Sequence, residues 1–321
     1  MKSGSNLERV LKAGHFAVTT EFGPPKGTDL SIVKNKAEFI RGNVDAVNVT
    51  DCQTAVVRLS SIATSAILVQ MGIEPVMQMT CRDRNRIAIQ SDIFGASALG
   101  IKNMLAISGD HHSFGNQKNA RKVYDIDSMQ MISLVKRMRD EQKMLSEDKP
   151  FQGEVPMFIG AAANPFAPPV EFRAMHLRKK IEAGADFIQT QSIYDVDKFR
   201  QWMKIVCDMG LDRQCAILAG LTPLKSAGMA RYMADNVPGM QIPESLLTRM
   251  AGVPKERAAE EGIRIFCEQV EQIREIPGIA GLHIMAIEWE HRIPEITERA
   301  GLLPRPVMQG NDFFSGDPQC R

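Results

Sequence analysis

Three side chains that could bind a ligand or move a proton each follow a short apolar run. Glu21 ends the run HFAVTTE, Asp110 follows LAISG, and Gln191 ends DFIQTQ. A carboxyl group can act as a general acid or base, and a glutamine amide offers both a donor and an acceptor to the edge of a flat heterocycle. Burial beside Phe22 would favour the protonated form of Glu21, as a general acid requires. Polar residues close other runs in the same way: Thr50, Gln78 and Asn164.

Each of these residues also has an ordinary structural explanation. Glu21 could pair with an arginine of Cys81–Arg86 (CRDRNR), which could itself be a solvated charged loop. Asp110 or Thr50 could cap a helix, and Gln191 could satisfy backbone groups inside a barrel. Taken singly, these explanations are at least as good as a functional one. Taken together, polar residues after six apolar runs favour one site, because the carboxyl ends of parallel strands meet at one end of a barrel.

The elements that must position these residues alternate along almost the whole chain. Short apolar runs, bounded by polar, Gly or Pro positions, predict eight strands. They are His15–Glu21, Val44–Thr50, Glu74–Thr80, Lys102–Ser108, Met157–Ala163, Asp186–Gln191, Cys215–Leu221 and Gly281–Ile287. Segments of helical period lie between them: Asp29–Arg41, Thr54–Met71, Arg86–Gly100, Ser128–Gln142, Val170–Ala183 and Val196–Met209. This alternation predicts an α/β fold, a closed (β/α)8 TIM barrel.

Three further segments complete the predicted organisation. Residues 1–14 are expected to form an N-terminal helix with Ser5 as its N-cap. The stretch Pro223–Pro277, between strands seven and eight, is longer than one barrel unit needs and predicts two or three extra helices beside the mouth. Residues 302–321 are a polar tail rich in Pro and Gly, either a loose terminus, a surface strap or a docking segment. Because no low-complexity linker interrupts the chain, residues 1–321 are expected to form a single domain.

Composition and missing motifs narrow the class of protein. The net charge of +1 gives no sign of nucleic acid or an acidic membrane surface as a partner. No apolar run approaches the roughly 18 residues that cross a bilayer, and the polar start lacks a signal-peptide pattern, so a cytoplasmic enzyme is expected. The six cysteines form no C-x-x-C pair, and no P-loop or G-x-G-x-x-G occurs. No metal site is therefore predicted, and any nucleotide would have to be held by the barrel loops.

Longer motifs extend this picture. They are TTEFGPP at Thr19–Pro25, NVTD at Asn48–Asp51, MTCRDRNR at Met79–Arg86, LGIKNMLAISGD at Leu99–Asp110, VYDIDS at Val123–Ser128 and KKIEAGADFIQTQ at Lys179–Gln191. On these motifs the chain resembles the methylenetetrahydrofolate reductase family, flavin-bearing α/β barrels of one-carbon metabolism. The resemblance runs from the first predicted strand through the eighth. MTCRDRNR and VYDIDS look most like the reductase half of bifunctional homocysteine methyltransferase–reductase proteins.

The resemblance implies a reaction and a role for each site residue. The reaction is the reduction of 5,10-methylenetetrahydrofolate to 5-methyltetrahydrofolate, with a flavin as hydride donor. Glu21 matches the general acid that helps to open the imidazolidine ring. Asp110 matches the aspartate that tunes the flavin and steadies the iminium cation, and Gln191 matches the pterin-binding glutamine. The implied flavin contacts come from Thr50, Gln78, Asp110, Asn164 and Lys180.

Departures from the family pattern leave the flavin and the electron donor open. Ser108 occupies the position of an arginine in some relatives, and Asn164-Pro165 replaces a Tyr-Pro, so the flavin could be FAD or FMN. Met229 and Met233 occupy the positions where NADH-using relatives present a Gln and a Phe to the nicotinamide. The resemblance therefore implies NAD(P)H or an iron–sulfur partner protein as donor, the latter as in the short catalytic subunits of acetogenic bacteria. A homo- or hetero-oligomer serving methionine biosynthesis or the acetyl-CoA pathway would fit.

Two other functions stay open on the sequence alone. The chain could be a non-catalytic barrel subunit that binds folate or flavin for a larger complex. The joint presence of Glu21, Asp110 and Gln191 argues against that interpretation. It could also be a pterin-dependent methyltransferase barrel, which would need an aspartate and a glutamine on the same pterin edge. A flavin spectrum of the purified protein would separate the last hypothesis from the reductase.

Overall fold

Eight parallel strands form a closed barrel in the computed structural model, which describes residues 1–237 and 239–308. The strands are β1 (Ala17–Phe22), β2 (Ala46–Val49), β3 (Pro75–Thr80), β4 (Asn103–Ile107), β5 (Phe158–Ala163), β6 (Phe187–Ser192), β7 (Ala216–Leu221) and β8 (Ile279–Ile284). Each strand pairs with the next in the sequence, and β8 pairs with β1 to close the barrel. The predicted (β/α)8 barrel is thus confirmed, and every predicted strand overlaps an observed one.

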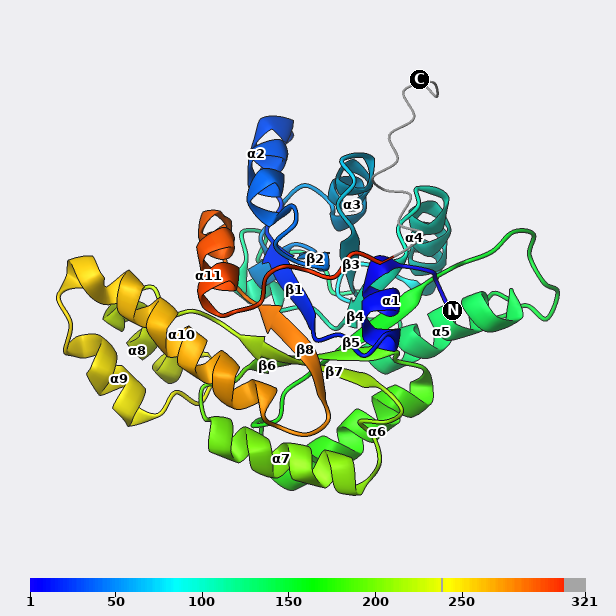
Figure 1. Ribbon diagram of the computed structural model, residues 1–321. Helices are drawn as coiled ribbons and strands as arrows, with labels where there is room; N and C mark the ends of the chain where they lie inside the picture. Colours follow the sequence, from blue (N-terminus) through cyan, green and yellow to red (C-terminus); the bar gives the residue numbers. More distant parts are fainter. Residues whose placement is uncertain (238, 309–321) are drawn as a thin grey trace.

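Helices surround the barrel (Figure 1). They are α1 (Asn6–Lys12), α2 (Leu30–Ile40), α3 (Ser61–Gln70), α4 (Arg86–Ala98), α5 (Ser128–Glu141), α6 (Arg173–Ala183), α7 (Val196–Asp208), α8 (Ala227–Asn236), α9 (Glu244–Ala251), α10 (Ala258–Arg274) and α11 (Ile293–Arg299). Short 3-10 turns are η1 (Gln53–Ala55), η2 (His112–Phe114), η3 (Val170–Phe172), η4 (Lys255–Arg257) and η5 (Glu290–Arg292). None of the helices in the described ranges is long and apolar enough to cross a membrane.

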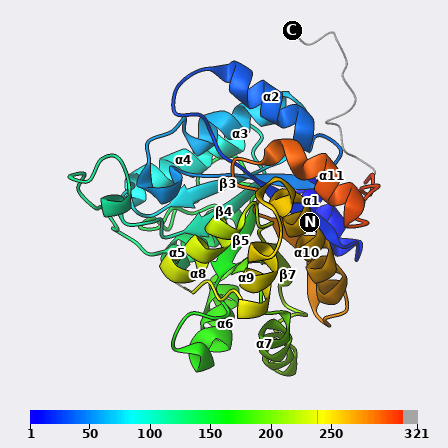
Figure 2. The ribbon, with the colours of Figure 1, turned by 90° about the vertical axis from the view of Figure 1, so that its left-hand side faces the viewer.

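The extra helices between strands seven and eight are α8, α9 and α10, within the predicted number. They form a lobe at one side of the barrel (left in Figure 1), with a small apolar core of its own. Figure 2, which views the molecule from that side, shows α8 and α9 in front of the strands. The lobe therefore lies on the side toward which the β6 and β7 arrows point, the carboxyl ends of the strands.

Local signals in the sequence set several helix ends. The Ser5 side chain accepts a hydrogen bond from the Glu8 backbone N–H, so the predicted N-cap of α1 is confirmed. Asp127 and Gln130 form a capping box at the start of α5. Gly184 ends α6 with a φ of 120°, a backbone conformation that side-chain-bearing residues rarely adopt.

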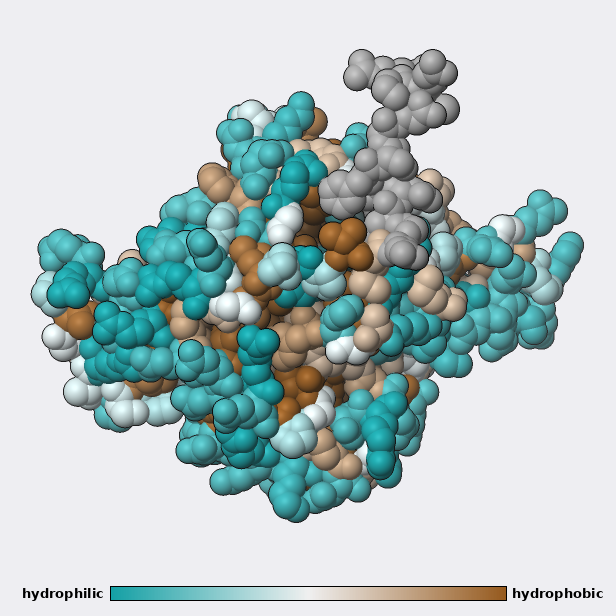
Figure 3. Space-filling view, in the orientation of Figure 1, coloured by the Kyte–Doolittle hydropathy of each residue, from teal (hydrophilic) through white to brown (hydrophobic). Residues whose placement is uncertain are grey.

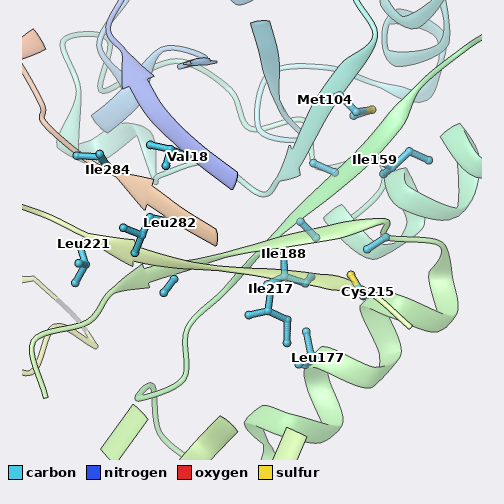
Figure 4. Close-up of a cluster of buried hydrophobic side chains, with 14 of the residues drawn as sticks. Val18, Met104, Ile159, Leu177, Ile188, Cys215, Ile217, Leu221, Leu282 and Ile284 are labelled. Atoms are coloured by element: carbon cyan, nitrogen blue, oxygen red, sulfur yellow. The ribbon is translucent and has the colours of Figure 1, made fainter. Parts of the chain in front are cut away.

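The main apolar core lies between the barrel and its helices. Outward-pointing strand residues pack against the inner helix faces, and Figure 4 shows Ile188 of β6, Ile217 of β7 and Leu177 of α6 gathered in one place. Burying each such side chain contributes about 1.5–3 kcal/mol. The outer helix surfaces are mostly hydrophilic in Figure 3, as expected for helices that bury one face.

The amino end of the barrel is closed by α1. Leu7 and Val10 pack with inward-pointing residues of the strands, among them Leu105 and Phe187. The Glu74 carboxylate accepts hydrogen bonds from the first two backbone N–H groups of α1, at 2.5 and 2.8 Å. Burial raises the pKa of Glu74, and these hydrogen bonds oppose that rise. α1 thus fills the barrel interior at this end, and the residues predicted to form a site lie at the opposite end.

One predicted helix is wrong in its first third. The segment Thr54–Met71 was expected to be a single helix, but α3 begins only at Ser61, where the Ser60 side chain caps it by accepting from Ala63 N–H. Before it, the chain forms η1 and then an extended stretch. The reason is a cluster of left-handed backbone conformations that no α-helix can contain: Cys52, Thr54 and Ala55.

Residues 302–308 run back under the amino end of the barrel. Arg305 donates hydrogen bonds to Asp45 at 2.5 Å and to the Phe16 carbonyl at 2.7 Å. The start of the predicted tail is therefore held against the barrel. The rest of that tail, residues 309–321, lies outside the described residues.

Candidate active site

The loops after the carboxyl ends of the strands form the mouth of the barrel, opposite α1. Glu21 lies near the end of β1, Gln191 near the end of β6, and Asp110 three residues after the end of β4. Glu21 and Gln191 are partly buried, and Asp110 is exposed. Because all the strands are parallel, the barrel brings these three predicted residues to the same end.

Glu21 has a histidine rather than an arginine as its neighbour. Its side chain is 18% exposed, and Oε1 lies 3.9 Å from Nε2 of His283 on β8. Within the described ranges, no lysine or arginine nitrogen lies within 4.0 Å of its carboxylate. The alternative that Glu21 pairs with an arginine of Cys81–Arg86 is therefore wrong, because those arginines bind aspartates instead. Glu21 is not neutralised by a fixed cation, as it would be in a purely structural ion pair.

Asp110 is held by a neighbouring loop. Its Oδ2 accepts a hydrogen bond from the Thr54 backbone N–H at 2.8 Å, and its carbonyl accepts one from Arg82 Nη1 at 3.1 Å. The alternative that Asp110 caps the next helix is wrong, since Asp127 caps α5. Gly109 turns the chain with a φ of 86°, and a Cβ there would lie only 2.9 Å from Thr80 Cβ. The turn that presents Asp110 thus requires glycine for both its conformation and its space.

The loop Cys81–Arg86 is solvated only in part: Asp83, Asn85 and Arg86 are exposed, as the alternative of a solvated charged loop expected, but Arg82 and Arg84 are not. The Arg82 side chain is 2% exposed, the smallest exposed fraction of any arginine in the ion pairs. Arg84 binds Asp51 at 2.6 Å and Asp92 at 2.9 Å. The Arg84–Asp51 pair ties the loop after β3 to the loop after β2, and the Arg84–Asp92 pair ties it to α4, so together they stiffen the wall of the mouth next to Asp110.

Thr50 and Gln78 line the mouth from adjacent strands. Thr50 Oγ1 donates to Gln53 Oε1 at 2.5 Å, so the alternative that Thr50 caps a helix through its own side chain is wrong. Gln78 is 7% exposed, and its amide makes no hydrogen bond with any residue of the described ranges. Both polar atoms of this amide keep some exposed surface, so water or a ligand in the mouth can reach them. Gln78 is thus available to bind a polar group in the mouth.

Lys180 and Asn164 lie on the β5 side. Lys180 Nζ donates to the Ala162 carbonyl at 2.5 Å, and no carboxylate of the described residues lies within 4.0 Å of it. Burial first, and then the nearby Arg173, lower the pKa of Lys180 to about 8. Asn164 accepts a hydrogen bond from Phe166 N–H at 3.2 Å, which fixes the turn after β5. An unpaired cation in this position can bind an anion such as a phosphate.

A cavity of about 410 Å³ opens beside the mouth. It lies between Gly23–Lys26, directly after β1, and the loop after β8 that carries Glu288 and His291. Two of its cations are paired: Lys36 binds Glu290 at 2.7 Å, and Arg58 lies 3.6 Å from Glu288. The cavity gives a ligand that is longer than one ring system room to extend past β1.

The sequence analysis missed four polar residues inside the barrel, below the mouth. They are Thr19, Asn48, Gln189 and His283, and all are buried. Three of them precede a predicted mouth residue by two positions: Thr19 before Glu21, Asn48 before Thr50 and Gln189 before Gln191. Side chains two apart on a strand point to the same face, so this spacing could have identified them.

The two methionines expected near a nicotinamide belong to the lobe. Met233 on α8 is buried in the apolar core of the lobe, and Met229 packs against the same core from a partly buried position. Neither presents a hydrogen-bonding group toward the mouth.

A closed (β/α)8 barrel with carboxylates and amides gathered at the carboxyl ends of its strands has the architecture of a barrel enzyme. The residues that lie there agree with a site for a ligand that carries both a polar heterocyclic edge and negative charge. The family model for methylenetetrahydrofolate reductase matches residues 6–301, so the chain belongs to that family.

Similar proteins agree with this assignment. Methylenetetrahydrofolate reductase 1 of Schizosaccharomyces pombe is 26% identical over 305 residues, which cover 91% of this chain and 47% of the yeast protein. Methylenetetrahydrofolate reductase 2 of Saccharomyces cerevisiae is 25% identical over 260 residues, covering 77% of this chain and 40% of that protein. The chain thus spans about half the length of the curated relatives it matches. A Clostridium thermocellum protein described as binding two copies of 5-methyl-5,6,7,8-tetrahydrofolic acid has the same fold, with a TM-score of 0.62 and 15% identity over 93% of this chain and all of that one.

Proposed function

We propose that this chain reduces 5,10-methylenetetrahydrofolate to 5-methyltetrahydrofolate with a flavin bound in the mouth of the barrel. The observation that carries the proposal is Glu21, a partly buried carboxyl group at the end of β1 whose neighbour is a histidine rather than a fixed cation. Folate reduction needs an acid at this point, because the five-membered ring must open before the one-carbon unit can accept a hydride. Membership of the reductase family makes this chemistry the first to test.

Each mouth residue has a separate task in the proposed reaction. Glu21 gives its proton to the ring nitrogen that leaves the methylene carbon. Asp110, held by the Thr54 N–H, stabilises the cation that then forms on the substrate. Gln191 holds the polar edge of the pterin with its amide. The bound flavin supplies the hydride.

The flavin also has residues suited to hold it. The Gln78 amide, which makes no hydrogen bond with the described residues, can bind a polar edge of the isoalloxazine ring. Thr50 and Asp110 lie on the same part of the mouth, and the unpaired Lys180 can bind a phosphate next to Asn164. FAD and FMN share the groups that these residues would bind, so both are candidates.

The electron donor is proposed to be a partner protein with iron–sulfur clusters, with NAD(P)H as the alternative. The support for the partner is that α8 carries Met229 and Met233 where a nicotinamide site would need hydrogen-bonding or aromatic side chains. Such a subunit would work in a hetero-oligomer in the cytoplasm, in methionine biosynthesis or the acetyl-CoA pathway.

A folate-binding barrel without redox chemistry is the second candidate. The Clostridium thermocellum structure, described as holding 5-methyl-5,6,7,8-tetrahydrofolic acid, makes folate binding on this fold concrete without requiring a flavin. The same evidence would fit a pterin-dependent methyltransferase. Lys180, which pairs with no carboxylate of the described residues, is suited to bind the phosphate of a flavin nucleotide.

The test is an absorbance spectrum of the purified chain, reconstituted separately with FAD and FMN, followed by anaerobic additions. After chemical reduction, 5,10-methylenetetrahydrofolate should reoxidise the flavin and yield 5-methyltetrahydrofolate. The Glu21→Gln variant should still bind the flavin, and its flavin should still be reduced by the chemical reductant. The variant should fail to reduce folate. Reduction of the flavin by NADH within the mixing time would refute the partner-fed version. Failure to bind either flavin would refute the reductase and leave the folate-binding barrel.

A further inference from the structure

The interior of the barrel just below the mouth is polar. Thr19, Asn48, Gln189 and His283 are between 0 and 3% exposed. Barrel interiors are usually filled by Val, Ile and Leu, and burying polar groups costs free energy unless each finds a partner. The layer below these four residues, next to α1, is apolar in the usual way. The polar layer therefore calls for a cause beyond packing.

The layer contains a reciprocal pair, since Gln189 Nε2 donates to Asn48 Oδ1 at 3.0 Å, and from Gln189 its hydrogen bonds lead through Thr19 to His283. Asn48 Nδ2 donates to Gln189 Oε1 at 2.6 Å, and Gln189 Nε2 donates to Thr19 Oγ1 at 3.0 Å. Thr19 Oγ1 lies 3.0 Å from His283 Nδ1 and 3.3 Å from the Leu282 carbonyl. The single hydrogen of Thr19 can go to only one of these two acceptors, and we place it on the shorter contact, to Nδ1. A neutral imidazole that accepts at Nδ1 carries its hydrogen on Nε2.

That nitrogen is the one that faces Glu21. We propose that His283 is a positioning residue: it donates its Nε2–H to Oε1 of Glu21, so the acidic proton sits on Oε2, from which it can pass to the substrate. The inference rests on the proposed role of Glu21. The separation of 3.9 Å is longer than a hydrogen bond, and catalytic contacts of this kind commonly tighten once the substrate is bound.

The proton balance explains why a donor is needed at that place. The Oε2 proton moves to the ring nitrogen, the bond between that nitrogen and the methylene carbon breaks, and its electron pair stays on the nitrogen. Glu21 becomes a carboxylate, and the substrate carbon becomes part of an iminium cation. The Nε2–H of His283 then faces a full negative charge, so its hydrogen bond is stronger after the transfer than before it. This ring-opening step requires no other reactant.

The first test reads the tautomer of His283 without flavin or folate. Protein labelled with ¹⁵N-histidine should show an Nε2–H signal that disappears in His283→Gln. Thr19→Val should alter that signal, because it removes the hydrogen that Nδ1 accepts. Thr20→Val is the matched control, since Thr20 is equally buried and its hydroxyl also donates to β8, to the Ile284 carbonyl at 2.8 Å, but it is outside the chain of donors. An Nδ1–H tautomer or a doubly protonated ring would overturn the proposal.

The second test measures reoxidation of the reduced, flavin-loaded enzyme by 5,10-methylenetetrahydrofolate. His283→Leu should slow the rate constant by about tenfold to a hundredfold, with little change in the folate concentration at half saturation. His283→Gln should recover most of that loss through its amide N–H. Equal losses in the Leu and Gln variants, or a similar loss in Thr20→Val, would show a purely structural role. If the wild-type enzyme fails to reduce folate, the proposed function fails, whereas the tautomer result stands independently.

Discussion

Replacing Gly109 by alanine perturbs the turn that presents Asp110 to the mouth. Gly109 has a φ of 86°, and forcing an L-residue into the left-handed region costs about 1–2 kcal/mol. The added methyl carbon would lie 2.9 Å from Cβ and Cγ2 of Thr80 and 3.2 Å from Cβ of Arg82. Overpacking of this kind costs about 1–3 kcal/mol. The two effects together predict a loss of about 2–5 kcal/mol in the free energy of unfolding.

Part of this cost can be relieved by moving the turn, and that movement should appear in the reaction. Thr80 is buried in β3 and cannot retreat, so the relief must displace Asp110 from the Thr54 N–H. We expect Gly109→Ala to slow folate reduction about tenfold at unchanged flavin content. Gly153→Ala is the matched control, because Gly153 has a φ of 91° but no atom within 4 Å of the new methyl group.

Urea unfolding gives the stability difference between the two variants, and reoxidation of the reduced flavin by 5,10-methylenetetrahydrofolate gives the reactivity. Gly153→Ala should lose only the conformational part, about 1–2 kcal/mol, and should react like the wild type. If Gly109→Ala were as stable as Gly153→Ala and as fast as the wild type, the close approach of Gly109 to Thr80 would have no consequence and the reasoning would fail.

Three other predictions concern single residues. Asp110→Asn keeps an acceptor for the Thr54 N–H but removes the charge, so folate reduction should slow at least tenfold while flavin binding persists; an unchanged rate would exclude electrostatic stabilisation by Asp110. Lys180, whose folded pKa of about 8 is below its unfolded value, destabilises the flavin-free protein below pH 8, and this penalty fades as the pH rises toward 10.5. Lys180→Met should therefore be more stable than the wild type at pH 7, by up to about 3 kcal/mol, and its advantage should shrink by pH 10; a constant difference in urea unfolding would contradict the buried-cation interpretation. Ser5→Ala removes the cap that accepts from Glu8 N–H at 3.1 Å and should cost about 1 kcal/mol in the same assay, with no effect on folate reduction.

The barrel could be predicted because its signals are local. Each strand is a short apolar run with polar or Gly boundaries, and most helix ends carry their own caps, such as Ser5 and Asp127. The exception, the segment Thr54–Met71, shows what local signals lack. Its left-handed start is fixed from a distance, by Asp110 on the Thr54 N–H and by Gly115, where even a Cβ would overlap the Ala55 carbonyl. Apolar spacing within the segment carries no information about either contact.

The candidate site likewise has a part that could be predicted from the sequence and a part that could not. That Glu21, Asp110 and Gln191 share one end of the barrel follows from strand order and could be predicted. The ion-pair and hydrogen-bond partners of each residue could not be predicted. The arginines of Cys81–Arg86 looked available to Glu21, yet they bind Asp51, Asp83, Asp92 and Asp125. Ion pairs between loops depend on side-chain reach and on the order of loops around the mouth. The spacing of residues along one strand predicts neither of these.

The polar layer under the mouth combines positions that the sequence predicts with a contact that only the closed barrel shows. The strand period of two places Thr19 below Glu21 and Gln189 below Gln191, so the sequence already contains the layer once the barrel is assumed. Closure of the barrel between β1 and β8 then sets His283 beside Glu21, which no local pattern could show. A hydroxyl and an amide in place of valine or leucine weaken the core, and that cost makes sense if the layer directs a hydrogen toward Glu21. The fold thus fixes the environment of the acid through residues from opposite ends of the chain, which is why replacing His283 is a sharper test of the site than replacing any exposed residue of the mouth.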